Sequence, residues 1–166
     1  RSIRIRMAAQ VNGYWYLNDY LYDSYDHWRD YCLTHGINVD YSFGNQCWDS
    51  PALLWYQYHL RLETGNGYAY GCWVYERDAN AQNPFIAVGG NASAVARKTM
   101  IKRGDCIVLA PSGLNYTGHI CFADEDYNGT DFLRCLGQNQ GQGTSPGKPS
   151  IVANLNIHAF LGSFRN

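Results

Sequence analysis

QCWDSPALLWYQYHLRLE, residues 46–63, predicts a helix that begins beside a cysteine. Apolar side chains recur through this run at helical spacing, and Gly65 is a plausible stop. Pro51 does not oppose the helix, because the first N–H groups of a helix have no partner within it and proline is tolerated there. Its position places the helix start near residues 46–48. Cys47 is therefore predicted to lie at a helix N-terminus.

This position offers Cys47 two properties of a nucleophile. The positive end of the helix dipole favours thiolate, which predicts a lowered pKa for the thiol. The free N–H groups of the first turn can hold a developing oxyanion. The alternative interpretation is that Cys47 is an inert buried thiol, one of six in the chain.

The composition excludes some classes of function. The 13 basic and 14 acidic residues leave a net charge of -1, which gives no reason to expect nucleic acid as a partner. No apolar run approaches the ~18 residues that a membrane span requires, so we expect no membrane partner either. Aromatic residues are dense, with 14 Tyr, 5 Trp and 6 Phe, which suits stacking on sugars or lining a peptide groove.

The chain of 166 residues is long enough for one domain with a hydrophobic core. Residues 1–6, RSIRIR, are interpreted as an appended segment, with the natural chain starting at Met7 and a single catalytic domain over residues 7–166. The basic opening leads into no apolar secretory region. We therefore expect synthesis in the cytoplasm without a signal peptide.

The cysteines are spread evenly, with no close pair and no Cys/His cluster at zinc-ligand spacing. Most are expected to be free thiols, which indicates synthesis in a reducing compartment. They are Cys32, Cys47, Cys72, Cys106, Cys121 and Cys135.

The pattern along the chain predicts an α+β fold, with N-terminal helices packed on an antiparallel β-sheet. A helix is predicted over residues 17–34, where Leu17, Leu21, Tyr25, Trp28 and Cys32 share one stripe, and a short one over 91–100. From residue 105 the period changes to two, which predicts strands within 105–111, 118–126 and 131–139. Residues 141–150 are predicted to be a flexible loop and 152–166 to end in one last strand, while 66–90 have no clear assignment.

Of the five histidines, His119 is the strongest candidate for a general base. It opens an apolar strand directly after Gly118, which permits close approach. Asn139 ends the next predicted strand, and adjacent antiparallel strands would place it beside His119, where it could orient the ring. Asp124 and Glu125 are alternatives for that orienting role.

Four motifs then resemble, in order and spacing, the CHAP domain family of cysteine- and histidine-dependent amidohydrolases and peptidases. They are GNQCWD at 44–49, RGDCIVLA at 103–110, GHICFAD at 118–124 and LGQNQG at 136–141, and the resemblance covers about residues 36–165. Many members are cell-wall lysins of phages and bacteria. The resemblance implies a papain-like α+β fold that cleaves amide bonds of peptidoglycan.

Carried over by motif, the resemblance implies Cys47 as nucleophile, His119 as base and Asn139 as orienter. Some members carry Glu and Asn two residues apart, as in LEQN, whereas this chain has Gly137 at the Glu position. A neutral amide fixes the imidazole tautomer but stabilises imidazolium less than a carboxylate does.

The stretch NVDYSFGNQCWD, residues 38–49, suggests a calcium loop. Alternating oxygen side chains with backbone carbonyls between them can wrap a hard cation. Several CHAP lysins bind calcium in the same loop, which here implies the side chains of Asn38, Asp40 and Asp49 and the carbonyls of Ser42 and Gly44 as ligands. The cation would brace the Cys47 loop without joining the chemistry. The alternative is a hydrated turn without metal.

We interpret the chain as a cysteine hydrolase that acts on an amide of the stem peptide or cross-bridge of the bacterial cell wall. Candidates for substrate contact are Gln46, Tyr41, Trp73 and Tyr116. The chain is expected to belong to a longer lysin, to be released by a phage, or to form part of a phage particle. Two alternatives are a non-catalytic wall-binding or structural module of the same fold and a papain-like hydrolase or acyltransferase with a non-wall substrate.

Overall fold

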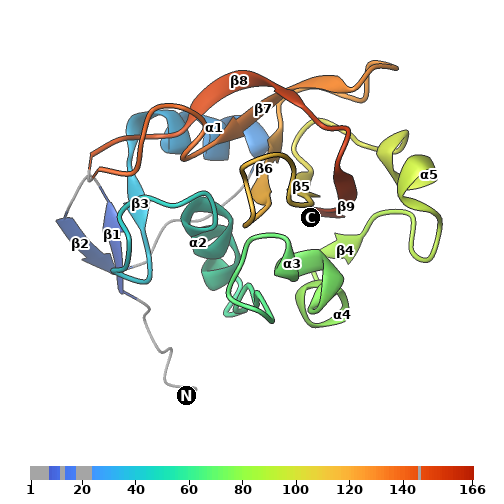
Figure 1. Ribbon diagram of the computed structural model, residues 1–166. Coiled ribbons are helices and arrows are strands. Elements are labelled where there is room, and N and C mark those ends of the chain that lie inside the picture. Colours follow the sequence, from blue (N-terminus) through green and yellow to red (C-terminus); the bar gives the residue numbers. More distant parts are fainter. Residues whose placement is uncertain (1–7, 12–13, 18–23, 146) are drawn as a thin grey trace.

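The computed structural model describes residues 8–11, 14–17, 24–145 and 147–166, and has two antiparallel sheets there (Figure 1). The smaller sheet has the order β2-β1-β3, from β1 (Ala8–Val11), β2 (Tyr14–Leu17) and β3 (Ile37–Asn38). The larger has the order β4-β9-β5-β6-β7-β8, from β4 (Ile86–Ala87), β5 (Cys106–Leu109), β6 (His119–Ala123), β7 (Phe132–Gly137), β8 (Ile151–Asn156) and β9 (Phe160–Arg165). The helices of the described part are α1 (Tyr25–Thr34), α2 (Asp49–Gln57), α3 (Gly71–Val74), α4 (Arg77–Asn80) and α5 (Ala94–Lys98).

The predicted α+β class and the three central strands are confirmed, but several boundaries differ. Residues 152–166 fall into two strands, β8 and β9, instead of one. The helix predicted over 17–34 begins at Tyr25; Leu17 lies in β2 and Leu21 is outside the described residues. The residues left unassigned at 66–90 contain α3, α4 and β4.

The helix α2 is shorter than predicted at both ends. It starts at Asp49, two residues after Cys47, with Trp48 as its N-cap. It ends at Gln57, because His59 adopts a left-handed φ of 59° and the N–H of Leu60 bonds back to the carbonyl of Trp55. This pairing satisfies a carbonyl that the helix leaves open, and it turns the chain before Gly65.

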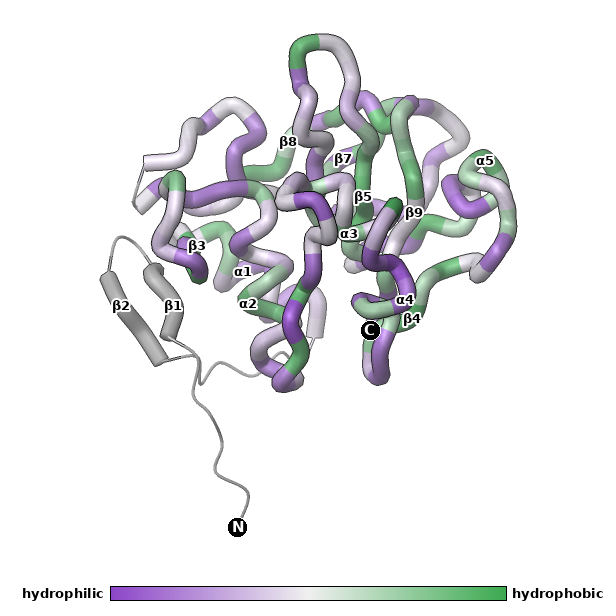
Figure 2. The backbone as a smooth tube through the Cα atoms, turned by 60° about the horizontal axis from the view of Figure 1, so that its bottom comes forward, coloured by the Kyte–Doolittle hydropathy of each residue, from purple (hydrophilic) through white to green (hydrophobic). Residues whose placement is uncertain are grey.

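Alternate side chains of the larger sheet enter two separate hydrophobic cores, so both of its faces are buried. One face packs against α1, α2 and α3; it contains Cys106, Val108, Ile120, Phe122, Leu136 and Phe164. The other packs beneath Ile101 and Ile157; it contains Ile107, Leu109, Cys121, Ala123, Leu133 and Cys135. Figure 2 shows hydrophobic residues concentrated on α2, β5 and β9. Because both faces of the sheet are buried, the central strands are continuous apolar runs in the sequence.

Aromatic rings join the helices to the sheet. Trp55 of α2 stacks on Phe85 with ring centroids 3.8 Å apart and meets Phe164 of β9 edge-on at 5.8 Å. Trp28 of α1 meets Phe122 of β6 edge-on at 6.0 Å. These contacts fix both helices, and with them the start of α2, against the sheet. Among the described residues, none of the helices is long and apolar enough to span a membrane.

Asn80 ties together the segments that follow α2. Its side chain is buried, accepts a hydrogen bond from the Glu63 N–H and donates to the carbonyls of Glu63 and Cys72. We expect Asn80→Ala to lower the free energy of unfolding by about 2–3 kcal/mol, because it leaves buried backbone groups unpaired.

Urea denaturation measures this effect, and the exposed Asn154→Ala on the edge strand β8 is the matched control. A loss for Asn80→Ala no larger than that of the control would contradict the assigned role of the Asn80 amide.

Candidate active site

Cys47 lies at the start of α2 with its side chain only 8% exposed. Its sulfur is within hydrogen-bond reach of the backbone N–H of Ile120 on β6, and of those of Cys47 and Trp48. Burial raises the pKa of the Cys47 thiol above its usual value, and these N–H groups oppose the rise only in part. The lowered pKa expected from the helix terminus is therefore outweighed by desolvation.

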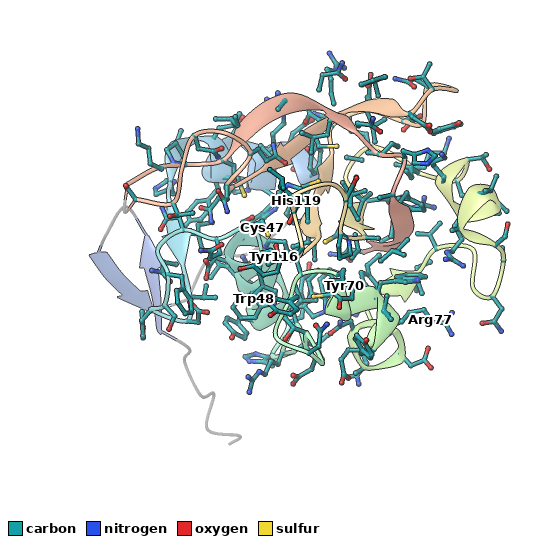
Figure 3. The ribbon with its side chains drawn as sticks, in the orientation of Figure 1. Cys47, Trp48, Tyr70, Arg77, Tyr116 and His119 are labelled. Carbon is teal, nitrogen blue, oxygen red and sulfur yellow. The ribbon has the colours of Figure 1, made fainter. Side chains whose placement is uncertain are left out.

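His119 is the first residue of β6, next to the Ile120 N–H that reaches the Cys47 sulfur. In Figure 3 the side chains of Cys47 and His119 lie next to each other. Burial lowers the pKa of His119, and a hydrogen bond to Gln140 opposes this. Burial thus favours the uncharged forms of both the thiol and the imidazole.

Gln140 determines which nitrogen of His119 carries the proton. Its Nε2 donates to the carbonyls of Cys135 and Ile151, at 3.2 and 3.1 Å. Its Oε1 therefore faces His119 as an acceptor, 3.0 Å from Nε2 of the ring. Because a carboxamide oxygen only accepts, the His119 Nε2 must carry the hydrogen, which leaves Nδ1 as the basic nitrogen. An imidazole in this tautomer can accept a proton from the thiol.

The side chain that accepts a hydrogen bond from His119 is Gln140 and not the expected Asn139. Asn139 is exposed, has a left-handed φ of 53°, and donates from Nδ2 to Oε1 of Gln46 at 3.4 Å. The alternative orienter Asp124 is engaged elsewhere, since it accepts from the Arg29 guanidinium at 2.7 Å and from the Tyr25 hydroxyl at 2.7 Å. Arg29 holds the pKa of Asp124 below its usual value.

Glu125, the other alternative, also lies apart from the ring. Its Oε1 accepts from the backbone N–H of Arg134 at 2.9 Å, and its Oε2 lies 3.5 Å from the Arg134 guanidinium. Both Asp124 and Glu125 follow the far end of β6 from His119.

Gly137 makes room for Gln140. A Cβ on Gly137 would lie 2.5 Å from Oε1 of Gln140 and 2.9 Å from Cβ of Cys121. The Gln140 carboxamide fills the space that a side chain at residue 137 would take. The orienting group thus reaches His119 from a residue three positions further along the chain.

Two more glutamines complete the arrangement. Gln138 is buried and donates from Nε2 to the carbonyls of Ile37 and Gln46, at 2.9 and 2.8 Å. Gln142 accepts from the Gln140 backbone N–H at 2.7 Å. None of these three roles was predicted from the sequence. Alternating glutamines in GQNQGQG, residues 137–143, are the only signal that could have indicated them.

Asp49 braces the loop that carries Cys47. Its buried carboxylate accepts from the N–H groups of Val39, at 2.9 Å, and Gln46, at 2.7 Å. Burial raises the pKa of Asp49 to about 8, with Asp40 adding to the rise and the two N–H donors opposing it. The loop is thereby tied to the first turn of α2.

The predicted calcium ligands meet the requirements of a cation site in part. The negative charge of Asp40 repels that of Asp49 and contributes to the raised pKa of Asp49. A cation bound between the two carboxyl groups would relieve this repulsion. Asp40 already accepts from the Ser42 N–H at 3.0 Å, and the Gly44 carbonyl accepts from the Gln46 N–H at 3.1 Å. In the described part of the chain no three His, Cys, Asp or Glu side chains gather as a metal would require. The remaining predicted donors, among them the buried Asn38, are neutral.

The predicted substrate residues divide into two groups. Tyr41 and Tyr116 are exposed, and Gln46 is half-buried with Nε2 bonded to the Phe43 carbonyl. Trp73 is buried against Phe164, and a Cβ on Gly162 would lie 2.3 Å from its indole. Only the edge of Trp73 is therefore available to a ligand.

Comparison with known proteins finds a solved structure with a similar fold. No family model matches the chain, and no curated protein matches it. Among solved structures, that of the wild-type endolysin LysIME-EF1 matches with a TM-score of 0.58 and 20% identity over 86% of this chain. The chain spans 63% of the length of that protein. At this identity the likeness establishes a shared fold.

Substitution at residues 139 and 140 identifies the group that orients His119. We expect Gln140→Leu to lower activity by about 10²-fold, because an unheld imidazole loses its productive orientation. Asn139→Gly, which suits the left-handed backbone, should change activity less than threefold if Gln140 alone is responsible.

NMR of the His119 ring nitrogens separates orientation from folding. The parent protein should show a proton on Nε2, and Gln140→Leu a mixture of tautomers. A larger loss for Asn139→Gly than for Gln140→Leu would assign the role to Asn139.

The reactivity of Cys47 should follow its raised pKa. Alkylation by iodoacetamide requires thiolate, so its rate is expected to climb with pH and reach half its maximum above pH 9.0, the usual value. Peptide mass spectrometry distinguishes Cys47 from the five other buried cysteines. A plateau of the rate near neutral pH would instead indicate a preformed thiolate–imidazolium pair.

Proposed function

We propose that this chain is a peptidoglycan hydrolase that cleaves an amide bond of the stem peptide or cross-bridge by cysteine catalysis. The observation that carries the proposal is the meeting of three groups: Cys47 at a helix start, His119 at a strand start, and the Gln140 carboxamide that holds the ring with Nδ1 unprotonated. The endolysin fold and the CHAP-like motifs point to the bacterial cell wall as the substrate.

The catalytic cycle begins with the Cys47 thiol. As the sulfur attacks the amide carbonyl, its proton passes to Nδ1 of His119, so charge develops only during the attack. In this cycle the backbone N–H of Cys47 stabilises the oxyanion. The imidazolium then protonates the leaving amine and a thioester forms. His119 next takes a proton from water, whose oxygen attacks the thioester and releases the acid and the free thiol.

The proposal includes a papain-like arrangement within a single catalytic domain. The nucleophile directly precedes helix α2 and the antiparallel strand β6 carries the base, which is the pairing such a fold implies. The chain would act on the wall as part of a longer lysin or of a phage particle. A non-catalytic wall-binding module and a hydrolase or acyltransferase with a non-wall substrate are the rivals.

Lysis assays with Cys47 variants test the reaction. Cys47→Ala and His119→Ala should abolish the turbidity loss of purified cell walls, lowering the rate by at least about 10³-fold because the nucleophile and the base act as a unit. Mass spectrometry of the soluble products identifies the amide that is cut. Unchanged lysis by Cys47→Ala would exclude cysteine catalysis, and folded, inactive parent protein would favour the wall-binding rival.

A structural Ca²⁺ is the second part of the proposal. Asp40 and Asp49 would hold it, with Asn38 and the carbonyls of Ser42 and Gly44 as neutral donors. We expect added Ca²⁺ to raise the melting temperature of the parent protein and to have no effect on Asp40→Ala. Calorimetry with and without EDTA measures both. Equal melting temperatures for the parent protein with Ca²⁺ and with EDTA would contradict the proposed Ca²⁺ site.

A further inference from the structure

Four tyrosines form a continuous row on the surface beside His119. The ring of Tyr68 stands edge-on to Tyr116 at 5.8 Å and stacks with Tyr70 at 6.2 Å. Tyr70 in turn lies 6.2 Å from Tyr75. We call Tyr116, Tyr68, Tyr70 and Tyr75 the tyrosine row. Figure 3 shows Tyr116 and Tyr70 on the side of the molecule that carries Cys47 and His119.

The rings of the row face solvent, unlike the core aromatics of the sheet. Tyr116 is 71% exposed, Tyr75 59% and Tyr68 42%, and only Tyr70 is half-buried. Exposed aromatic side chains that adjoin one another can mark a binding surface. Phenol rings offer apolar faces together with hydroxyl groups, a combination that matches a ligand with both C–H faces and hydroxyls.

The loops that carry the row are held rigidly. The side-chain oxygen of Asn115 accepts from the Thr117 N–H and hydroxyl, and its Nδ2 donates to the Gly118 carbonyl. Asn66 accepts from the Tyr68 N–H at 3.0 Å. Gly71 lies so close to the Thr64 carbonyl that a Cβ there would be 1.7 Å from its oxygen. The row is therefore preorganised, which lowers the entropic cost of binding.

The row is continuous with the candidate active site. The Tyr70 N–H donates to the Thr117 carbonyl at 3.2 Å, and a Cβ on Gly118 would lie 2.7 Å from Cβ of Tyr70. Tyr116 precedes His119 by three residues. Three residues of chain span at most about 11 Å, so the backbone of Tyr116 lies within that distance of the backbone of His119.

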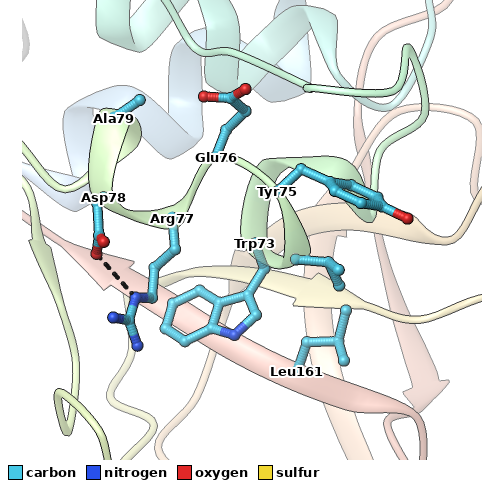
Figure 4. Close-up of a pocket in the computed structure, with 8 residues that line it drawn as sticks. Trp73, Tyr75, Glu76, Arg77, Asp78, Ala79 and Leu161 are labelled. Atoms are coloured by element: carbon cyan, nitrogen blue, oxygen red, sulfur yellow. Dashed lines mark hydrogen bonds and ion pairs between the residues drawn. The ribbon is translucent and has the colours of Figure 1, made fainter.

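At its far end the row reaches a pocket of about 590 Å³. Tyr75 lines this pocket together with the exposed edge of Trp73 and with Arg77, as Figure 4 shows. The Arg77 guanidinium lies over the Trp73 ring, 5.7 Å from its centroid, and bonds Asp78, so the pocket has an aromatic floor with polar groups at its side. The surface from His119 to Trp73 therefore offers aromatic and polar contacts to an extended polar chain.

We propose that the tyrosine row binds the glycan strand of peptidoglycan and thereby places the first amide of the stem peptide at Cys47. The inference rests on the proposed function and specifies its bond. That amide is separated from the sugar ring only by the lactyl group, whereas a cross-bridge amide lies several residues further along the peptide. Because Tyr116 precedes His119 by only three residues, we expect a sugar held on Tyr116 to bring the nearer bond to the nucleophile.

The binding half of the proposal is tested without catalysis. The Cys47→Ala protein should bind β-1,4-linked N-acetylglucosamine hexamer in NMR titrations, and adding Tyr116→Ala or Tyr75→Ala should weaken Kd at least tenfold. Phe132→Ala, an exposed aromatic on β7, is the matched control and should leave Kd unchanged. Near-ultraviolet circular dichroism checks that each variant is folded. No binding by Cys47→Ala, or equal binding by the Tyr116→Ala variant, would overturn the role of the row.

The bond is tested on purified cell walls with the active protein. We expect released peptides that begin with a free N-terminal alanine and glycan that carries free lactyl carboxyl groups. Peptides cut inside the stem or cross-bridge would overturn the placement while leaving the proposed function intact. If the active protein releases nothing, the proposed function fails and so does the placement, whereas hexamer binding still decides whether the row holds glycan.

Discussion

The buried carboxamide of Gln138 is the interaction on which the candidate site depends. It pairs with both the N–H and the carbonyl of Ile37 and also holds the carbonyl of Gln46, with distances of 2.7 to 2.9 Å. These partners lie about 100 residues earlier in the chain, so the bonds join the end of β7 to the segment that leads to Cys47. Because the side chain is fully buried, each of its bonds must be made for the fold to be stable. The nucleophile is thereby placed relative to the strands that carry the base.

The loop before Cys47 stores conformational strain. Tyr41 and Phe43 have left-handed φ values of 62° and 61°, which is unfavourable for bulky side chains. Such a conformation persists only when its surroundings hold it. The Asn45 N–H donates to the Thr144 carbonyl at 2.6 Å, and its side chain donates to the carbonyls of Ser145 and Lys148. Residues 141–150, predicted to be a flexible loop, therefore include the support that keeps the Cys47 loop in place.

Local patterns predicted the elements of the site well. A helix that follows Cys47, the strand start at His119 and the alternation of the central strands depend on neighbours in sequence, and the structure has all three, although the helix begins at Asp49. The residue that orients His119 could not be predicted from such local patterns. Extending the β6–β7 register would place Asn139 opposite His119, but β7 ends at Gly137 and the left-handed turn at Asn139 brings Gln140 to the ring instead. The direction of the Cys47 pKa shift likewise depends on burial by distant segments, which no local pattern records.

Gly137 and Gln140 compete for one volume beside the imidazole. A side chain at residue 137 would take the space that the Gln140 oxygen occupies, so the two positions cannot both contribute an orienting group. In relatives that share this fold, we therefore expect these positions to vary together: a glycine at the first with a long amide at the second, or an acidic side chain at the first with the second turned away. The orienting group can thus move along the chain during evolution while its place in space is kept.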